Sequence, residues 1–438
     1  MSNADGRPNI LFFYPDTLRH DWIGPRGLTP VRTPNVKRLA DEGVDFPRAV
    51  TPSPLCAPAR ACLAAGKEYD RCRVPSNNVN YPLDQPTFYA LLRDAGSHVM
   101  GCGKFDLHKP DLDWGLDGKR LLGEWGFSDG IDSEGKLDGV NAYSQNGGPM
   151  GPHLAYLEQQ GLARAHVADY DRRSGDRTAV FPTPLPEEAY CDNWIGQNGL
   201  DLLAAAPEGQ PWFLQVNFNG PHGPWDITER MEARWRGVEH PFPVNGEQHT
   251  VKEYDAIRQN YSAMVENIDR WVGIYLEELG KRGELDSTLT VFSSDHGDML
   301  GDHNQWGKSK PLHGSVGAPL VIWGPGVRQG AIWDGPATAL DVTATFLDYA
   351  GVSVPGDMDS RSLRDALEGR TEEHREYVLS GLADWRLVFD GRYKYIREGD
   401  GRTMLFDMDA DPHEERSIID AAPQEAARLA GMLDRESL

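Results

Sequence analysis

Short apolar runs alternate along this chain with stretches whose apolar residues recur at helical spacing. Residues 10–14 form an apolar run closed by Pro15, which is typical of a strand buried on both faces. Residues 34–43 repeat apolar residues at helical spacing and end in Gly43, which predicts a helix. The chain therefore begins with a strand followed by a helix.

The same alternation recurs as far as residue 350. Further helices are predicted over 88–92, 254–279, where Gly280 would end the helix, and 338–350. Further strands are predicted over 98–100, 212–218 and 289–292. Alternating strands and helices predict an α/β fold with a largely parallel central sheet and helices on both faces.

Two segments depart from this alternation. Residues 115–188 lack clear periodicity and predict a loop-rich insertion over the sheet, which could shape a substrate pocket. A turn at 356–359 predicts a boundary between a large domain, 1–358, and a C-terminal subdomain, 359–438. The second part is predicted to be a smaller α+β unit with a short antiparallel sheet and an Ala-rich final helix. Its predicted strands cover 377–379, 386–389 and 393–396.

Polar residues follow the predicted strands within a few positions. Asp16 follows the first strand, His222 follows the strand at 212–218, and Asp295 and His296 follow the strand at 289–292. In open α/β sheets ligands bind beyond the carboxyl ends of the strands. Two carboxylates and one imidazole suit a hard divalent cation, with calcium as the first choice and manganese as the second. The alternative is a turn aspartate beside a hydrogen-bonded structural histidine.

Cys56 opens the pentapeptide Cys-Ala-Pro-Ala-Arg, which ends at Arg60 and follows a polar turn at 51–54. A cysteine near proline is commonly a small buried hydrophobe, and that interpretation stands beside a functional one. The four other cysteines form no Cys-x-x-Cys pair with it or with each other, which suits a reducing compartment. No apolar run precedes residue 10 and no stretch approaches a membrane span, so a cytoplasmic location is expected.

Charge narrows the possible partners. The 438 residues carry a formal net charge of −23 and have a sequence pI near 4.9. Such a field repels phosphates, which disfavours binding to nucleic acid or to an anionic membrane. It also disfavours a long polyanionic glycan and favours a small or cationic substrate. Acidity that serves only solubility is the alternative.

Several motifs, in their order along the chain, resemble those of the type I, formylglycine-dependent sulfatases of the alkaline phosphatase superfamily. These motifs occupy 9–16, 33–43, 55–61, 103–104, 221–222, 294–298, 307–308, 393–395, 405–407 and 411–412. The segment 295–301 is similar in form to choline sulfatases, aryl sulfatases and phosphonate monoester hydrolases. Members of these groups often lack a secretion signal.

The resemblance implies a metal site built around a modified side chain. A formylglycine-generating enzyme would convert Cys56 to formylglycine. Asp16, Asp295, His296 and that formylglycine would hold the cation. Arg60 would hydrogen-bond the hydrated aldehyde, whose hydroxyl attacks sulfur.

The resemblance also implies three groups that act on the substrate. Lys104 and Lys308 match the two sulfate-binding lysines, which would stabilise negative charge on the sulfuryl oxygens in the transition state. His222 matches the histidine that protonates the departing alcohol. For either lysine alone, a solvated surface charge is the alternative.

Three positions depart from the family pattern. Asp106 stands where a histidine is usual, and His108 follows two residues later; we favour His108 as the base, with Asp106 as the alternative. Thr17 replaces a frequent fourth oxygen ligand, so the cation shell could contain water. Gly317 replaces a common arginine that has no assigned catalytic role.

The expected activity is hydrolysis of a sulfate monoester of a small organic alcohol, phenol or sugar. The alternatives are hydrolysis of a phosphonate monoester or phosphodiester at the same site, and a non-catalytic binding protein with this fold. A homo-oligomer is left open. Four tryptophans could contact the alcohol by ring-face attraction, with core packing as the alternative: Trp114, Trp125, Trp225 and Trp306.

Overall fold

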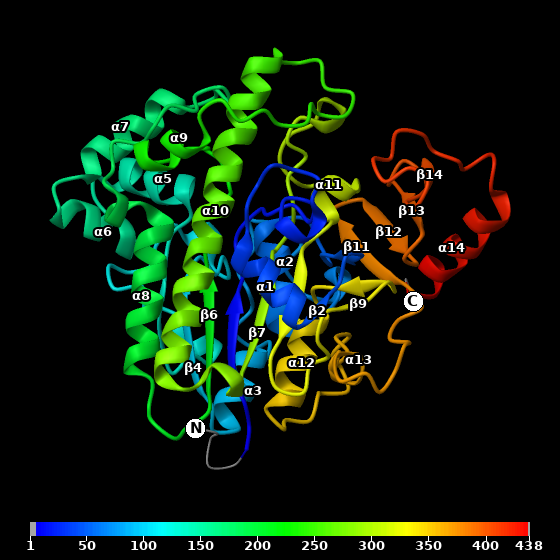
Figure 1. Cartoon of the computed structure of the whole chain (residues 1–438), viewed down its shortest axis with the longest axis horizontal. Coiled ribbons are helices and arrows are strands. Elements are labelled where there is room, and N and C mark those ends of the chain that lie inside the picture. Colours follow the sequence, from blue (N-terminus) through cyan, green and yellow to red (C-terminus); the bar gives the residue numbers. More distant parts are fainter. Residues whose placement is uncertain (1–5, 437–438) are drawn as a thin grey trace.

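An eight-stranded sheet runs through the centre of the molecule in a computed structural model that describes residues 6–436 (Figure 1). Its strand order is β5-β4-β6-β1-β7-β8-β2-β9. Neighbouring strands are parallel except where β8 pairs with β7 and with β2. The predicted largely parallel sheet is therefore confirmed. The strands are β1 (Asn9–Phe13), β2 (Val44–Asp45), β3 (Ala49–Val50), β4 (His98–Gly103), β5 (Asp129–Asp132), β6 (Trp212–Asn217), β7 (Thr288–Ser293), β8 (Leu320–Trp323), β9 (Ala331–Ile332), β10 (Ala337–Thr338), β11 (Val378–Leu382), β12 (Trp385–Phe389), β13 (Tyr393–Arg397) and β14 (Thr403–Asp407).

Helices cover both faces of this sheet, as expected for alternating strands and helices. Residues of α2, α3 and α12 pack in one hydrophobic cluster with one face, and residues of α1, α8 and α10 pack in a second cluster with the other. The α-helices are α1 (Pro34–Glu42), α2 (Cys56–Ala65), α3 (Phe88–Asp94), α4 (Leu122–Trp125), α5 (Lys136–Asn146), α6 (Pro152–Gln159), α7 (Ala163–Arg173), α8 (Cys191–Ala205), α9 (Glu229–Trp235), α10 (Val251–Arg282), α11 (His313–Val316), α12 (Asp341–Tyr349), α13 (Arg364–Leu367) and α14 (Pro423–Glu436).

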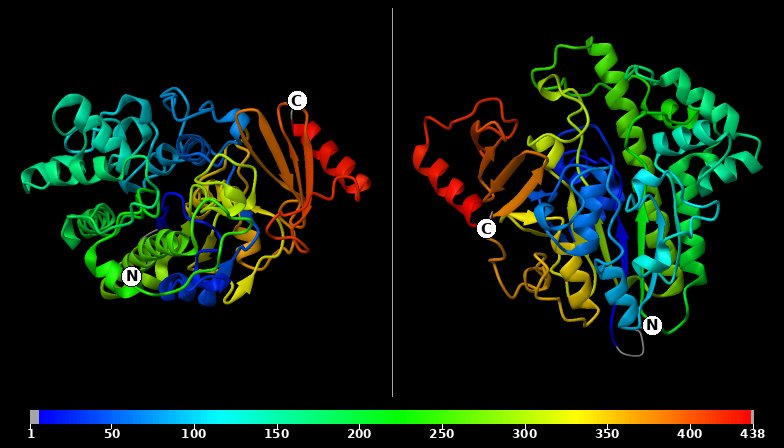
Figure 2. Two further views of the ribbon diagram at one scale, coloured as in Figure 1. Left: turned by 90° about the horizontal axis from the view of Figure 1, so that it is seen from above. Right: turned by 180° about the vertical axis from the view of Figure 1, so that it is seen from behind.

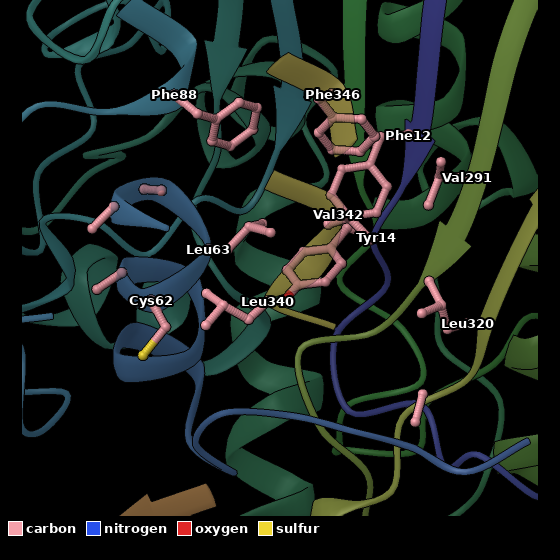
Figure 3. Packing of buried hydrophobic residues seen from close by; sticks show 14 of the residues in the cluster. Phe12, Tyr14, Cys62, Leu63, Phe88, Val291, Leu320, Leu340, Val342 and Phe346 are labelled. Atoms are coloured by element: carbon pink, nitrogen blue, oxygen red, sulfur yellow. The ribbon is translucent and has the colours of Figure 1, made fainter. Parts of the chain in front are cut away.

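The two faces of β1 divide its side chains between the clusters. Phe12 belongs to the first cluster and Phe13 to the second, because successive residues of a strand point to opposite faces. Figure 3 shows Phe12 beside Phe346 of α12. The two ring centroids lie 5.1 Å apart. The apolar run at the start of the chain is thus buried on both sides.

The long helix α10 extends beyond its predicted limits. It begins after Thr250, whose side chain accepts the backbone N–H of Glu253 while the Glu253 carboxylate accepts that of Thr250. It ends at Gly283, which adopts φ 67°, whereas Gly280 lies inside the helix. The predicted stop at Gly280 is therefore wrong, because the helix continues for three further residues, to Arg282.

The prediction that 115–188 is loop-rich is also wrong, since this segment contains α5, α6 and α7. Glu134 stabilises the start of α6 by accepting the backbone N–H groups of His153 and Leu154 at 3.4 and 2.7 Å. Glu134 precedes the first of these two residues, His153, by 19 positions. The helices also lack a single apolar stripe, so the sequence pattern does not reveal them.

The C-terminal part contains the predicted antiparallel sheet, in the order β11-β12-β13-β14. The final helix α14 covers one face of this sheet, at the opposite end of the molecule from α5–α7 (Figure 2). The other face joins the main hydrophobic cluster through residues such as Leu387. Because one cluster runs across the proposed boundary, the division at residue 358 stays a prediction.

None of the helices within 6–436 combines the length and the apolar character needed to cross a bilayer.

Shortening Phe346 tests the packing between α12 and the sheet. Phe346→Ala is expected to lower the free energy of unfolding by about 3–5 kcal/mol, since it leaves a cavity among buried aromatic rings. Urea denaturation measures this change. The control, Leu116→Ala, alters a side chain of a residue that is 61% exposed; a comparable loss in both variants would contradict this account of the core.

Candidate functional site

Four polar residues extend beyond four adjacent strands. Asp16, Lys104, His222 and Asp295 follow β1, β4, β6 and β7, which neighbour one another in the order β4-β6-β1-β7. Parallel strands bring their carboxyl ends to one edge, so residues far apart in sequence meet there. The expected juxtaposition at this edge is present.

Four potential metal ligands lie together at this edge. One ligand atom from each of Asp16, Cys56, Asp295 and His296 lies within 4.8 Å of the others. All four residues are buried, and the two aspartates are only 1% and 0% exposed. Buried carboxylates require compensating positive charge, which a divalent cation could supply.

The ring of His296 is oriented as a ligand. Its Nδ1 donates to the carbonyl of Gly297 at 3.0 Å, which leaves the lone pair on Nε2. Nε2 lies 3.7 Å from Asp295 Oδ2 and 4.0 Å from Asp16 Oδ1. This buried atom has no hydrogen-bond partner among residues 6–436. A cation between the carboxylates would satisfy it, so these residues fit a metal ion.

Cys56 occupies the first position of α2. Its Sγ lies 3.8 Å from Asp16 Oδ1 and 2.8 Å from Lys308 Nζ. Burial and Asp16 disfavour the thiolate, but Lys104 and Lys308 outweigh them and lower the pKa of Cys56. The side chain is therefore in contact with cations as well as with the ligand cluster.

Arg60 lies one helical turn after Cys56 and links the cluster to β4. Its Nε donates to Asp295 Oδ2 at 3.1 Å, and its Nη1 donates to the carbonyl of Lys104 at 2.5 Å. Arg60 is 3% exposed, and its guanidinium lies 5.1 Å from the ring centroid of Tyr14. Arg60 therefore holds both the Asp295 carboxylate and the backbone at Lys104 in place.

Lys104 Nζ contacts two carboxylates. It forms a short ion pair with Asp16 Oδ2 and lies 3.1 Å from Asp106 Oδ2. Burial disfavours the charged form of Asp16, but Lys104, His222 and Lys308 hold the pKa of its carboxyl well below its usual value. Lys104 is thus a buried cation within the site.

His222 and Lys308 line a cleft of about 540 Å³ beside the ligand cluster. The Nδ1 of His222 donates to the carbonyl of Gly223 at 2.5 Å, which leaves Nε2 as the free ring atom. Burial and Lys308 hold the pKa of His222 well below its usual value. Trp225 and Trp306 line the same cleft, with ring centroids 5.7 Å apart.

His108 is not among the four potential metal ligands, and its role as the base stays a prediction. Its Nε2 lies 2.7 Å from Asp132 Oδ2, at the end of the edge strand β5. Asp106 instead contacts Lys104. The backbone at Asp106 adopts φ 54°, which turns the loop between Asp106 and His108. The weighed alternative, Asp106, therefore lies closer to the site. Trp114 and Trp125 are buried near His108, which agrees with core packing.

The sequence did not single out Lys109. Its Nζ lies 3.0 Å from Asp106 Oδ2 and forms a short ion pair with Asp138. Asp106 therefore bridges Lys104 and Lys109, while its Oδ1 is buried without a hydrogen-bond partner among the described residues. In the sequence, His108 and Lys109 follow Asp106, where the chain departs from the family pattern. This pair of basic residues is the local signal that could have indicated Lys109.

Thr17 and Gly317 each have a structural explanation. Thr17 donates its Oγ1–H to Asp16 Oδ1 at 2.6 Å and its backbone N–H to Asp295 Oδ1 at 2.9 Å, so it orients both carboxylates. A Cβ at position 317 would lie 2.6 Å from His20 Nδ1. It would also lie 2.8 Å from the backbone carbonyl oxygen of His313, so this ring and this carbonyl together favour glycine there.

Comparisons with known proteins agree with this geometry. The family model described as Sulfatase matches residues 8–352, and the one described as N-sulphoglucosamine sulphohydrolase, C-terminal, matches 301–436. A choline-sulfatase of Rhizobium meliloti (strain 1021) is 29% identical over 463 residues, covering 98% of this chain and 86% of that protein. An arylsulfatase of Clostridium perfringens (strain 13 / Type A) is 25% identical over 448 residues, covering 95% and 91%.

The fold has counterparts among solved structures. The phosphonate monoester hydrolase SpPMH from Silicibacter pomeroyi superposes with a TM-score of 0.80 at 22% identity, covering 98% of this chain and 95% of that one. This likeness concerns the fold alone. Because the Sulfatase model matches well over half of the residues, the chain belongs to the sulfatase family of the alkaline phosphatase superfamily.

Proposed function

We propose that this protein hydrolyses a sulfate monoester of a small organic alcohol, phenol or sugar. The observation that carries the proposal is the position of Cys56, whose Sγ lies among two aspartates, a histidine and the Nζ of Lys308. Cations beside a potential nucleophile suit the transfer of a tetrahedral anion.

In this proposal the nucleophile is formylglycine, produced from Cys56 by a formylglycine-generating enzyme. When hydrated, this group supplies one hydroxyl to attack sulfur and a second to release sulfate afterwards. Arg60 and Lys308 lie where they can hydrogen-bond that side chain or its neighbours. The helix α2 directs the positive end of its dipole toward position 56.

The proposed cation is Ca²⁺, with Mn²⁺ as the alternative. Asp16, Asp295, His296 and the modified Cys56 would hold it, and hard oxygen donors with one imidazole suit both ions. When bound, the ion lowers the pKa of the attacking hydroxyl and takes up charge on a sulfuryl oxygen. Thr17 would keep both carboxylates turned toward it.

Lys104 and Lys308 are proposed to bind the sulfuryl oxygens. Charge on these oxygens is compensated best by cations that are already in place, because no solvent has to reorganise. His222 would donate a proton from Nε2 to the alcohol oxygen as the sulfur–oxygen bond breaks. An anionic ester beside this ring would raise the pKa of His222 and favour the protonated form needed for the donation.

The cleft supports a ring-bearing or apolar alcohol. Trp225 and Trp306 lie beside His222 and Lys308, where indole faces can pack against an aryl ring or a sugar. A volume of about 540 Å³ is enough for a small substrate. These residues rather than the sulfate-binding lysines would select the alcohol.

Two alternatives use the same residues. A phosphonate monoester or phosphodiester presents a similar tetrahedral anion to Lys104 and Lys308, so relative rates must separate the two chemistries. A non-catalytic binding protein is favoured only by the departures at Asp106 and Thr17.

The cysteines are free and buried, which supports the proposed location in a reducing compartment such as the cytoplasm.

Mass spectrometry tests the proposed nucleophile. After co-expression with a formylglycine-generating enzyme, the peptide bearing Cys56 is expected to show the mass change for replacement of CH2SH by CHO. This material should cleave an aryl sulfate faster than the matching aryl phosphonate. Cys56→Ala should abolish turnover, while Cys62→Ala in the same helix should retain it. Full activity with an intact thiol at Cys56 would refute the mechanism.

Metal retention tests the ligand set. We expect one divalent ion per wild-type chain and at least about 10-fold weaker retention in His296→Gln, because the unpartnered Nε2 is lost. Elemental analysis after equilibrium dialysis against CaCl2 or MnCl2 measures this and compares the two ions. His98→Gln, at the opposite end of β4, is the control and should bind like wild type. Equal binding by both variants would remove His296 from the ligand set.

Kinetics separate the roles of Asp106 and His108. Asp106→Asn is expected to lower kcat/KM about 10–100-fold, since Lys104 and Lys109 lose their shared carboxylate charge. His108→Gln should change kcat/KM by no more than about threefold, because it contacts Asp132 at the sheet edge. Steady-state assays on an aryl sulfate decide, and the opposite ranking would restore the sequence-based preference for His108.

A further inference from the structure

The C-terminal sheet reaches the loop that carries Lys308. Lys394 on β13 is 0% exposed, and its Nζ donates to the carbonyl of Pro311 at 3.0 Å. The same Nζ forms a short ion pair with Glu414, whose Oε2 accepts the backbone N–H of His313 at 2.5 Å. One buried ion pair therefore binds two backbone groups of this loop.

The loop has little freedom between these contacts and the site. Lys308 precedes Pro311 by three residues, and its Nζ lies 2.8 Å from Cys56 Sγ. Between them, the N–H of Ser309 donates to the carbonyl of Pro54, just before the Cys56 helix. A shift at 311–313 would thus move the backbone from which Lys308 extends.

The Lys394–Glu414 pair is buried, whereas Lys308, on the loop that the pair binds, borders the open cleft. A long side chain at a cleft wall keeps more conformational freedom when its backbone can also move. A buried ion pair is weak evidence for stability, since apolar residues of similar volume often serve as well. Its two hydrogen bonds to the loop are what an apolar replacement could not provide.

We propose that Lys394 and Glu414 are positioning residues that hold Lys308 at the sulfate side of the site. The inference rests on the proposed function, in which Lys308 binds a sulfuryl oxygen. It assigns to the C-terminal sheet a part in the reaction, although none of the site residues described above belongs to that sheet. The pair acts through the loop and does not touch the substrate.

The first test removes both charges together, so that neither partner is left buried alone. Lys394→Met/Glu414→Met should fold, as judged by circular dichroism, and should lower kcat/KM for an aryl sulfate about 10–100-fold, because small misplacements of a reacting group are costly. Hydrogen exchange at the Ser309 amide should accelerate in the same variant. Arg397→Met, which removes the exposed ion pair between Arg397 and Asp434 of the same subdomain, should match wild type in both measurements.

A double-variant cycle shows whether the effect passes through Lys308. In a Lys308→Met background, removing the Lys394 and Glu414 side chains should lower kcat/KM by less than about twofold further, since coupled residues are not additive. A merely structural role would repeat the full loss in that background. If the double Met variant does not fold, Lys394→Met/Glu414→Gln retains the acceptor for His313 and should still lower kcat/KM and accelerate Ser309 exchange relative to wild type, both by less than is expected for the double Met variant.

The outcomes separate this inference from the proposed function. Wild-type kcat/KM and unchanged Ser309 exchange in the folded double variant would overturn the positioning role, and so would a fully additive cycle. If the mature wild-type protein cleaves no sulfate ester, the proposed function fails. In that case the exchange at Ser309 still decides whether the pair holds the loop.

Discussion

Charge compensation in a buried space governs the arrangement of this protein. Asp16 and Asp295 lie almost without solvent contact at the carboxyl ends of β1 and β7. Lys104 forms an ion pair with Asp16, and Arg60 forms one with Asp295. The Nε2 atom of His296 lies near both carboxylates and has no hydrogen-bond partner among residues 6–436. Carboxylates in such a place must be neutralised by protein cations or by a metal ion, and here protein cations and potential metal ligands both surround Cys56.

The order of the central strands makes this arrangement possible. Because β4, β6, β1 and β7 are neighbours, residues far apart in the sequence share one edge of the sheet, such as Pro15 and Ser294, which are 279 residues apart. The clusters on the two faces fix these strands, so the positions of the polar residues depend on the aromatic packing around Phe12 (Figure 3). The C-terminal sheet adds a second support, since it contacts the loop of Lys308 through Lys394 and the turn before Cys56 through Gly381.

Residues adjacent to predicted strands could be placed from the sequence, whereas the contacts of Asp106 and His108 in the loop after β4 could not. Asp16 and Asp295 follow apolar runs, so their convergence required only the topology of a parallel sheet. The choice between Asp106 and His108 depended on a left-handed backbone at Asp106 and on Asp132 of another strand, and neither leaves a local pattern. The helices α5–α7 were not predicted, because stabilising contacts such as the cap that Glu134 provides at the start of α6 come from residues outside the helix.

Anomalous diffraction from crystals of the mature, active protein, grown with MnCl2, tests the central claim most directly. We expect a single strong peak between Asp16, Asp295 and His296, together with an oxygen-bearing side chain in place of the thiol at Cys56. An unmodified cysteine in active crystals, or no peak between the two aspartates, would contradict it.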